Sequence, residues 1–442
     1  MEEKQTTNRL DMESVGKSFL RYLIPSIVGM LLMAVNIVAD GIMVGNKLGP
    51  IALAGVGIAG PVFTIFVAMS LWIGIGAATR YSAMMGAKRP DQARIIFSHA
   101  IASIFVLTII IGLTAFIFRT ELAYLLGANV DTFEYTSGYL NVMLLFGFVF
   151  TVENTFSILV RNDGGPNTAM IALISTSVVN IILNYVFLFI LDFGVEGAAF
   201  ATILGGLVGL VILSTHFFRK KSNLRLVRFK FDKKLTLLIL AVGFPSFLAE
   251  VGISVFTISH NLTFKYLAGT VGVSAFTILN YVHSVMLLLF LGMGAAIQPL
   301  ISYYSGAKDE QKIKQTIRLA IATSLAAGIF FMLIGQFAAT QIVSLFGDFP
   351  EEVLALAVSG IKLFFIAYLF MGTNFVMMTY YQSIGHIRMA TWITAAREMI
   401  VLLILLMIMP RLFGLTGVWL AIPTSEFIVL VTIYYYHRKW HS

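Results

Sequence analysis

The sequence contains no cysteine, and only 12% of its 442 residues are charged. The lack of cysteine excludes disulfides, thiolate metal sites and thiol chemistry, and it leaves the redox compartment open. The scarcity of charge separates the chain from soluble domains, in which about 25% of residues are charged. Hydrophobic residues make up 58% of the chain, and its mean hydropathy is +0.90. The sequence is therefore that of a membrane protein.

Sequence motifs of enzymes are also missing. The chain has no HExxH metal motif, no GxSxG nucleophile elbow and no closely spaced pair of intramembrane aspartates. The connections between apolar stretches are short, which leaves no room for a soluble catalytic domain of ordinary size. We expect neither an enzyme nor a bound metal or cofactor.

Apolar stretches long enough to cross a bilayer recur from end to end. A hydrocarbon core of about 30 Å requires about 20 apolar residues per helix. Because lipid offers no partners for backbone polar groups, spans of this length must be helices and not barrel strands. The sequence predicts twelve spans, at about 19–44, 51–83, 93–117, 134–160, 167–190, 195–217, 235–264, 271–302, 313–337, 355–382, 388–409 and 414–436.

The second half of the chain repeats the first at an offset of 220 residues. Gap-free pairs include Pro25 with Pro245, Gly74 with Gly294, Ser82 with Ser302, and 86–88 with 306–308, both Gly-Ala-Lys. Each half has six spans, so both enter from the same side as parallel repeats. The predicted fold is an all-α membrane protein with two pseudo-symmetric six-helix bundles. Its predicted parts are an N-terminal segment 1–18, an N-lobe 19–217, a linker 218–234, a C-lobe 235–436 and a C-terminus 437–442.

The basic residues are distributed by loop. With the N-terminus in the cytoplasm, roughly 24 Lys and Arg fall on the cytoplasmic side and about five outside. Their largest cluster, 219–234, is interpreted as a topology signal and linker, with anionic lipid binding as the alternative. Membrane topology, and not nucleic-acid binding, thus explains the net charge of +8. Residues 1–18 lack the features of a signal peptide, so we expect the first helix to stay as an anchor in a multi-pass protein with both termini cytoplasmic.

Polar residues at membrane depth are costly and are functional candidates by default. Asp40 lies in the first span, and Asn36 lies one turn earlier on the same face. A carboxyl group in low-dielectric surroundings can hold and release a proton near neutral pH, and with amide oxygens it also suits a cation such as Na⁺. Ser177, Asn180 and Asn184 form a stripe on the fifth span, for which coupling and interhelical hydrogen bonding both stay open.

The second half carries a different set of charges: Glu250, Arg397, Glu398 and Glu426. An arginine among acids is interpreted as a charge-compensated structural cluster, with a conformational or second proton role as the alternative. A similar part is assigned to Glu153 and Arg161 on the fourth span. His260 and His283 are interpreted as interior histidines with satisfied hydrogen bonds.

Two further features concern shape. Pro25 bends the first helix and predicts either a hinge or a static kink. Methionine is a soft side chain typical of adaptable binding surfaces, and Met33 and Met69 are candidates to touch substrate.

The chain resembles the multidrug and toxic compound extrusion (MATE) family, in particular its bacterial DNA-damage-inducible and MepA-like branches. The stretches that carry the resemblance are VNIVADGIMVGNKLGPIALAGVG at 35–57, GFPSFLAE at 243–250, GMGAAIQPLISYYSGAK at 292–308 and FGLTGVWLAIPTSE at 413–426. The resemblance implies a binding cavity whose polar residues match Asp40, Asn180, Thr202, Tyr139 and Asn154. Where many relatives carry a second aspartate on the fifth helix, this chain has Asn184.

The predicted function is a secondary active antiporter that exports bulky, often cationic amphipathic drugs in exchange for protons. Asp40 would bind the proton and attract the substrate. Coupling to Na⁺ and a lipid-linked oligosaccharide flippase of the wider superfamily are the alternatives, and a monomer is expected. The two copies differ at the polar positions. In the alignment of the halves Asp40 corresponds to His260 and Asn180 to Ile400, so the polar site belongs to the first half.

Overall fold

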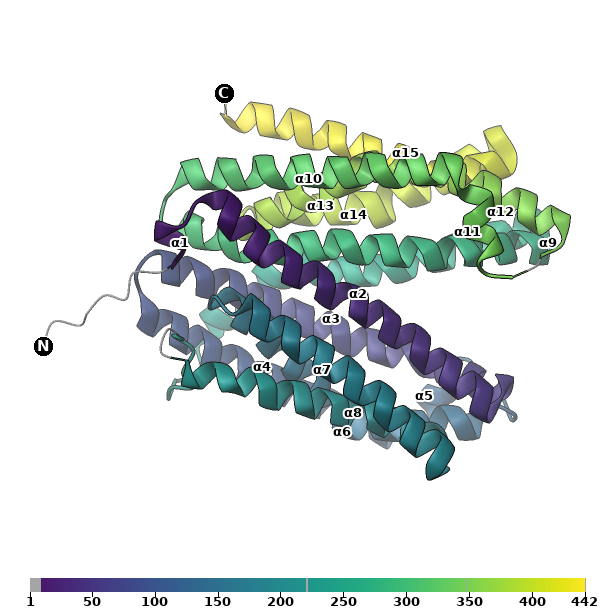
Figure 1. Ribbon diagram of the computed structural model, residues 1–442, viewed down its shortest axis with the longest axis horizontal. Coiled ribbons are helices and arrows are strands. Elements are labelled where there is room, and N and C mark those ends of the chain that lie inside the picture. Colours follow the sequence, from purple (N-terminus) through teal and green to yellow (C-terminus); the bar gives the residue numbers. More distant parts are fainter. Residues whose placement is uncertain (1–8, 220–221, 348, 442) are drawn as a thin grey trace, which may run out of the picture. The chain divides into compact units, whose positions relative to one another are not determined.

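The computed structural model describes residues 9–219, 222–347 and 349–441, and every regular element in these ranges is a helix (Figure 1). Parts of the predicted N-terminal segment (1–8), linker (220–221) and C-terminus (442) lie outside the described residues. The long helices are α2 (Val15–Leu48), α3 (Pro50–Gly86), α4 (Pro90–Ile117), α6 (Phe133–Asn162), α7 (Pro166–Tyr185), α8 (Gly194–Ser214), α9 (Lys233–Gly306), α10 (Glu310–Phe337), α12 (Glu351–Phe364), α13 (Tyr368–Ser383), α14 (Ile387–Ala395) and α15 (Val401–His441). The short helix α1 (Arg9–Met12) precedes α2, and the short helices α5 (Arg119–Leu125) and α11 (Ala339–Ser344) lie between longer ones.

Within the described chain, ten helical segments are long and apolar enough to cross a membrane. Two of these segments each contain two spans, because α9 is interrupted at Gly269 and α15 at Gly414, both with non-helical backbone angles. The prediction of twelve membrane-spanning helices is therefore confirmed. Proline opens three of the spans at the first helical position, where its missing N–H costs nothing.

The repeat is visible in the backbone. Residues with left-handed φ angles recur at an offset of 220: Gly49 and Gly269, Lys88 and Lys308, Gly127 and Gly347, Gly194 and Gly414. The lysine pair is the most telling, since a positive φ is uncommon outside glycine, and the two angles are 58° and 57°. Both halves thus turn the chain at the same places with the same geometry.

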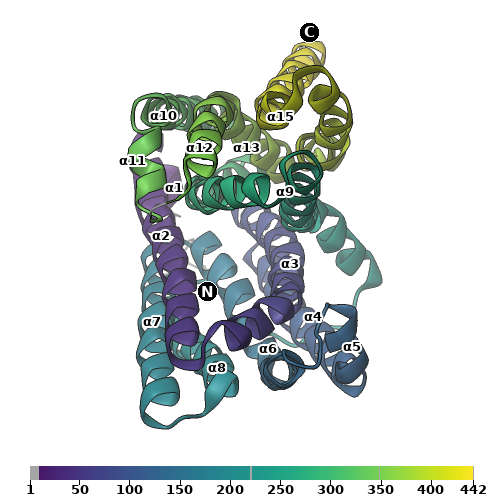
Figure 2. The same ribbon diagram turned by 90° about the vertical axis from the view of Figure 1, so that its right-hand side faces the viewer.

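The chain divides into two compact units. The first comprises Met1–Phe247 and Ser302–Asp309, and the second comprises Leu248–Ile301 and Glu310–Ser442. In the first unit α6 is the central helix, packed against α3, α4 and α8, while α2 packs mainly against α7. Viewed end on, helices α2, α3, α6, α7 and α8 surround a common axis (Figure 2).

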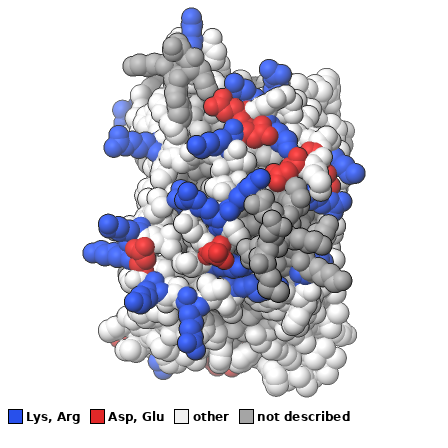
Figure 3. Space-filling view, turned by 90° about the vertical axis from the view of Figure 1, so that its left-hand side faces the viewer, with Lys and Arg blue, Asp and Glu red and all other residues white. Residues whose placement is uncertain are grey.

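The basic linker is held against the first unit. The carboxylate of Asp163 accepts hydrogen bonds from Tyr81 Oη (2.7 Å), His216 Nε2 (2.9 Å), Ser222 Oγ (3.0 Å) and the backbone N–H of Asn223 (2.9 Å). Lys and Arg side chains predominate over Asp and Glu on the face of the molecule seen in Figure 3. This buried aspartate therefore fixes one end of a strongly basic segment.

Candidate functional site

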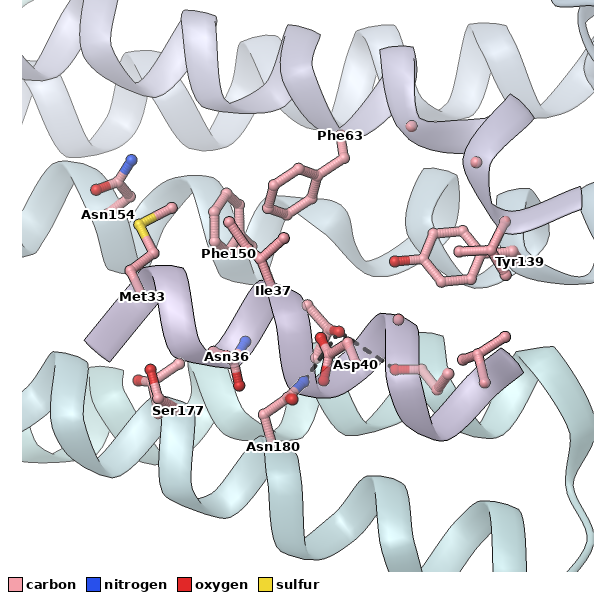
Figure 4. A pocket seen from close by; sticks show the side chains of 18 of the residues that line it. Met33, Asn36, Ile37, Asp40, Phe63, Tyr139, Phe150, Asn154, Ser177 and Asn180 are labelled. Carbon is pink, nitrogen blue, oxygen red and sulfur yellow. Dashed lines mark hydrogen bonds between the residues drawn. The ribbon is translucent and has the colours of Figure 1, made fainter. Parts of the chain in front are cut away.

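A cavity of about 300 Å³ opens within the first unit, between α2, α3, α6, α7 and α8 (Figure 4). It is large enough for a small organic ligand by the usual range of ligand pockets. Nine of the residues named from the sequence line it: Met33, Asn36, Asp40, Tyr139, Glu153, Asn154, Ser177, Asn180 and Thr202. The structure therefore brings these residues from four helices, far apart in the sequence, to one site, and α3 completes its wall.

Asp40 is the start of a chain of hydrogen bonds across three helices. Asn184 Nδ2 donates to Asp40 Oδ1 at 2.5 Å and also lies 3.1 Å from Asn180 Oδ1. Asn180 Nδ2 in turn donates to Thr202 Oγ1 at 3.1 Å. Because Asn180 and Asn184 are one turn apart on α7, their amides stack along one face and join α2 to α8. Asn184 does not line the cavity itself but holds its carboxylate in place.

Two amide oxygens beside Asp40 are free to accept a hydrogen bond or to bind a cation. Asn36 Oδ1 and Asn184 Oδ1 are buried and have no hydrogen-bond partner among the described residues. For Asn184 the orientation of the amide is set by its nitrogen, which donates to Asp40 and leaves the oxygen as the free acceptor. Carboxylate and amide oxygens are ligands that hard cations prefer, so the three groups could bind a proton at Asp40 or a small cation between them.

The walls around the polar network are apolar. Phe63 of α3 and Phe150 of α6 are in ring contact, with centroids 4.9 Å apart, and Ile37 and Met33 of α2 face them (Figure 4). Aromatic faces also attract cations. An amphipathic cation thus finds apolar surface and a carboxylate in the same cavity.

Two residues named from the sequence lie in surroundings that differ from the expected ones, Glu153 and Met69. Glu153 lines the cavity and is 1% exposed, and its Oε1 accepts a hydrogen bond from Thr176 Oγ1 at 3.3 Å. Within the described residues it forms no ion pair with Arg161, the partner role considered above. Met69 does not line the cavity, because this side of α3 faces the hydrophobic core of the unit, beside Phe66 and Ile73. Whether Glu153 faces the cavity depends on the rotation of α6 about its own axis relative to α7, which the sequence pattern did not give.

Two other predicted residues occupy supporting positions. Pro25 is buried inside α2, which continues as a helix on both sides of it. Asn154 lines the cavity but donates its amide to Ser70 Oγ of α3 at 2.6 Å, so it is already partnered.

The second unit contains the charge cluster. Arg397 contacts Glu426 Oε1 through Nη2 (2.9 Å) and Nε (3.0 Å), and Glu398 lies 3.5 Å from it. Asn374 Nδ2 donates to Glu426 Oε2 at 2.6 Å, and Glu250 lies within electrostatic range of Glu398. The geometry is that of a hydrogen-bonded buried ion pair with additional carboxylates around it.

The two interior histidines lie in an aromatic cluster of the second unit. His283 Nδ1 is 3.1 Å from Tyr368 Oη, and His260 Nδ1 is 2.9 Å from the Phe256 carbonyl oxygen. His260 Nε2 is buried with no partner in the described chain, so the expectation of full satisfaction was wrong for this atom. Its ring stacks instead on Phe276 at 5.2 Å.

Comparisons with known proteins agree with one another. A family model described as MatE matches residues 25–186 and 245–408, two ranges that begin 220 residues apart. The chain is 28% identical over 428 residues to the multidrug export protein MepA of Staphylococcus saprophyticus, covering 95% of this chain and 92% of that protein. A solved outward-facing multidrug resistance MATE family transporter of the MOP superfamily is 25% identical, with a TM-score of 0.90 over 99% of this chain and 98% of its own. A MOP superfamily transporter from Pyrococcus furiosus, 24% identical, shares the fold with a TM-score of 0.91 over 99% and 98%.

Proposed function

Because the chain belongs to the MatE family, we propose that it is an antiporter that exports bulky, cationic amphipathic compounds in exchange for protons. Membership in this family makes the chain a membrane transporter and not an enzyme. The relatives named as multidrug export proteins support drug-like substrates. The observation that carries the coupling proposal is Asp40, a carboxylate that lines an apolar cavity and is tied to α7 by Asn184.

In the proposed cycle the ionised carboxylate of Asp40 attracts the cationic group of the substrate, and Phe63 and Phe150 contact its apolar part. A proton from outside then neutralises Asp40 and removes the attraction, so the substrate leaves. Each proton that enters down 100 mV contributes about 2.3 kcal/mol to this export. Proton and cation compete for one carboxylate, which makes their movements opposite.

The test is efflux of a fluorescent organic cation from proteoliposomes under an imposed pH gradient. Asp40→Asn removes the titrating group while keeping its size, and we expect pH-driven efflux to be lost. Asp131→Asn is the matched control, since Asp131 is an exposed aspartate of the same unit. Unchanged efflux by Asp40→Asn, with Asp131→Asn also active, would refute the mechanism.

Sodium coupling is the second candidate, because Asn36 and Asn184 each have a buried, unpartnered amide oxygen near Asp40. One carboxylate with two neutral oxygens is a weak site for Na⁺ compared with a site of several carboxylates. Efflux measured under separate pH and Na⁺ gradients distinguishes the two. We expect the pH gradient alone to suffice, and a strict requirement for Na⁺ would exclude proton coupling.

We also propose the bacterial cytoplasmic membrane as the location, with both termini cytoplasmic and the transporter acting as a monomer. The basic linker and the predominance of Lys and Arg on the face in Figure 3 support this orientation. The natural chain lacks cysteine, so Asp91→Cys introduces one exposed thiol at the start of α4. An impermeant maleimide should label it in inside-out vesicles and not in intact cells.

A further inference from the structure

The cavity of the first unit contains a second carboxylate that the proposed coupling does not use. Glu153 of α6 lines the same cavity as Asp40 and is 1% exposed. No Lys or Arg lines the cavity, and neither carboxylate forms an ion pair within the described ranges of the chain. A buried carboxylate is costly without a cationic partner, so a cation that enters the cavity from outside the protein would stabilise ionised Glu153.

Both carboxylates are anchored to the same helix. Thr176 donates to Glu153, and Asn184 donates to Asp40. These two donors are eight residues apart on α7, and a rise of 1.5 Å per residue separates them by about 12 Å along the helix. The helix therefore fixes the spacing of two anionic groups within one cavity.

Most of the cavity wall is apolar, although Asn36, Ser177 and Asn180 also line it. Its apolar residues include Phe63, Phe150, Ile37 and Leu173. Gly209 of α8 allows the Glu153 end to form, because a Cβ there would lie 2.2 Å from Thr176 Oγ1 and 2.6 Å from Glu153 Oε1. The cavity thus offers two carboxyl groups at different levels of α7 and a largely apolar wall beside them.

We infer that the cavity selects dications, organic compounds with two cationic groups about 12 Å apart joined by an apolar spacer. One cationic group would lie at Asp40 and the other at Glu153, with the spacer against the two phenylalanine rings. The inference rests on the proposed function for Asp40 and adds Glu153 as the residue that determines specificity. It predicts a dependence on ligand length that a single carboxylate cannot produce.

The experiment is equilibrium binding to the purified full-length protein in detergent. The probes are bis-quaternary ammonium alkanes with nitrogens separated by roughly 6 to 18 Å, a range that brackets the spacing given by the helix rise. Tetraalkylammonium ions of matched apolar surface serve as monocations. We expect affinity to peak near 12 Å and the dication to bind about tenfold more tightly than the monocation, a difference of about 1.4 kcal/mol.

Three variants locate the effect. Glu153→Gln should lower the ratio of dication to monocation affinity about tenfold and flatten the length dependence, whereas Glu153→Asp should retain the preference. Glu134→Gln is the matched control, an exposed glutamate at the start of the same helix, and it should leave the ratio unchanged. Should Glu153→Gln fail to fold, the length series on the natural protein still decides.

Affinity that is independent of spacer length in the natural protein would overturn the inference. Protonated Glu153 in the complex with the dication would overturn it too. An equal loss of monocation and dication affinity in Glu153→Gln would overturn it as well. Failure of the proposed function is seen separately, as absent monocation efflux under a pH gradient. A protein that transports monocations without preferring dications keeps the first proposal and loses the second.

Discussion

The buried ion pair of the second unit allows a quantitative prediction. Replacing Glu426 by leucine removes two charged contacts from Arg397 and one hydrogen bond from Asn374. Arg397 and Glu426 are 3% and 2% exposed, so water cannot replace the lost partner. Arg397 would keep only Glu398, at 3.5 Å, and the face of Phe375, 3.9 Å from its guanidinium carbon.

Removing one partner of a buried ion pair typically costs 3–5 kcal/mol, because the other charge stays buried without compensation. Glu398 and Phe375 offset part of this cost, so we expect Glu426→Leu to lower the free energy of unfolding by about 3 kcal/mol. The double variant Arg397→Met with Glu426→Leu should recover part of the loss, since an apolar pair replaces the two ions while Glu398 loses its contact with Arg397.

The assay is reversible unfolding in mixed micelles with increasing denaturing detergent, read by tryptophan fluorescence. Glu351→Gln is the control, because Glu351 is an exposed glutamate of the same unit, and it should shift the unfolding free energy by less than about 0.5 kcal/mol. A loss below about 1 kcal/mol for Glu426→Leu, or a double variant less stable than the single one, would refute the reasoning.

Three further predictions concern the first unit. Asn184→Asp places a second carboxylate beside that of α2, so an imposed Na⁺ gradient should stimulate efflux more than it does in the natural protein; an unaltered response contradicts this. Gly209→Ala should cost about 1–3 kcal/mol in unfolding free energy, because the added Cβ has no room. Gly206→Ala is the control and should be near neutral, since the nearest atom to its Cβ would be 3.8 Å away. Equal effects of the two substitutions would contradict this packing argument. Asp163→Ala removes the hydrogen bonds from Ser222 and Asn223 that hold the linker, so trypsin should cleave the linker faster, while the exposed control Asp91→Ala should leave the rate unchanged.

The family and the fold could be predicted from the sequence because both depend on periodic, local properties. Twelve apolar runs, short connections and one gap-free register determined the helix number and the duplication, and the MatE match confirms the resemblance. The positive φ angles at Lys88 and Lys308 show that the repeat is preserved in the backbone conformation as well as in the sequence.

The sequence also identified most polar residues of the cavity, because Asp40 and the stripe on α7 are polar where lipid-facing helices are apolar. It could not place Glu153 or Met69, which depend on the rotation of α6 and α3 about their own axes. Packing against neighbouring helices sets that rotation, and a single helix in lipid does not encode it. The amino-acid order alone thus determined which helices form and which buried groups are costly, whereas tertiary packing decided which of those groups share a cavity and how far apart they lie.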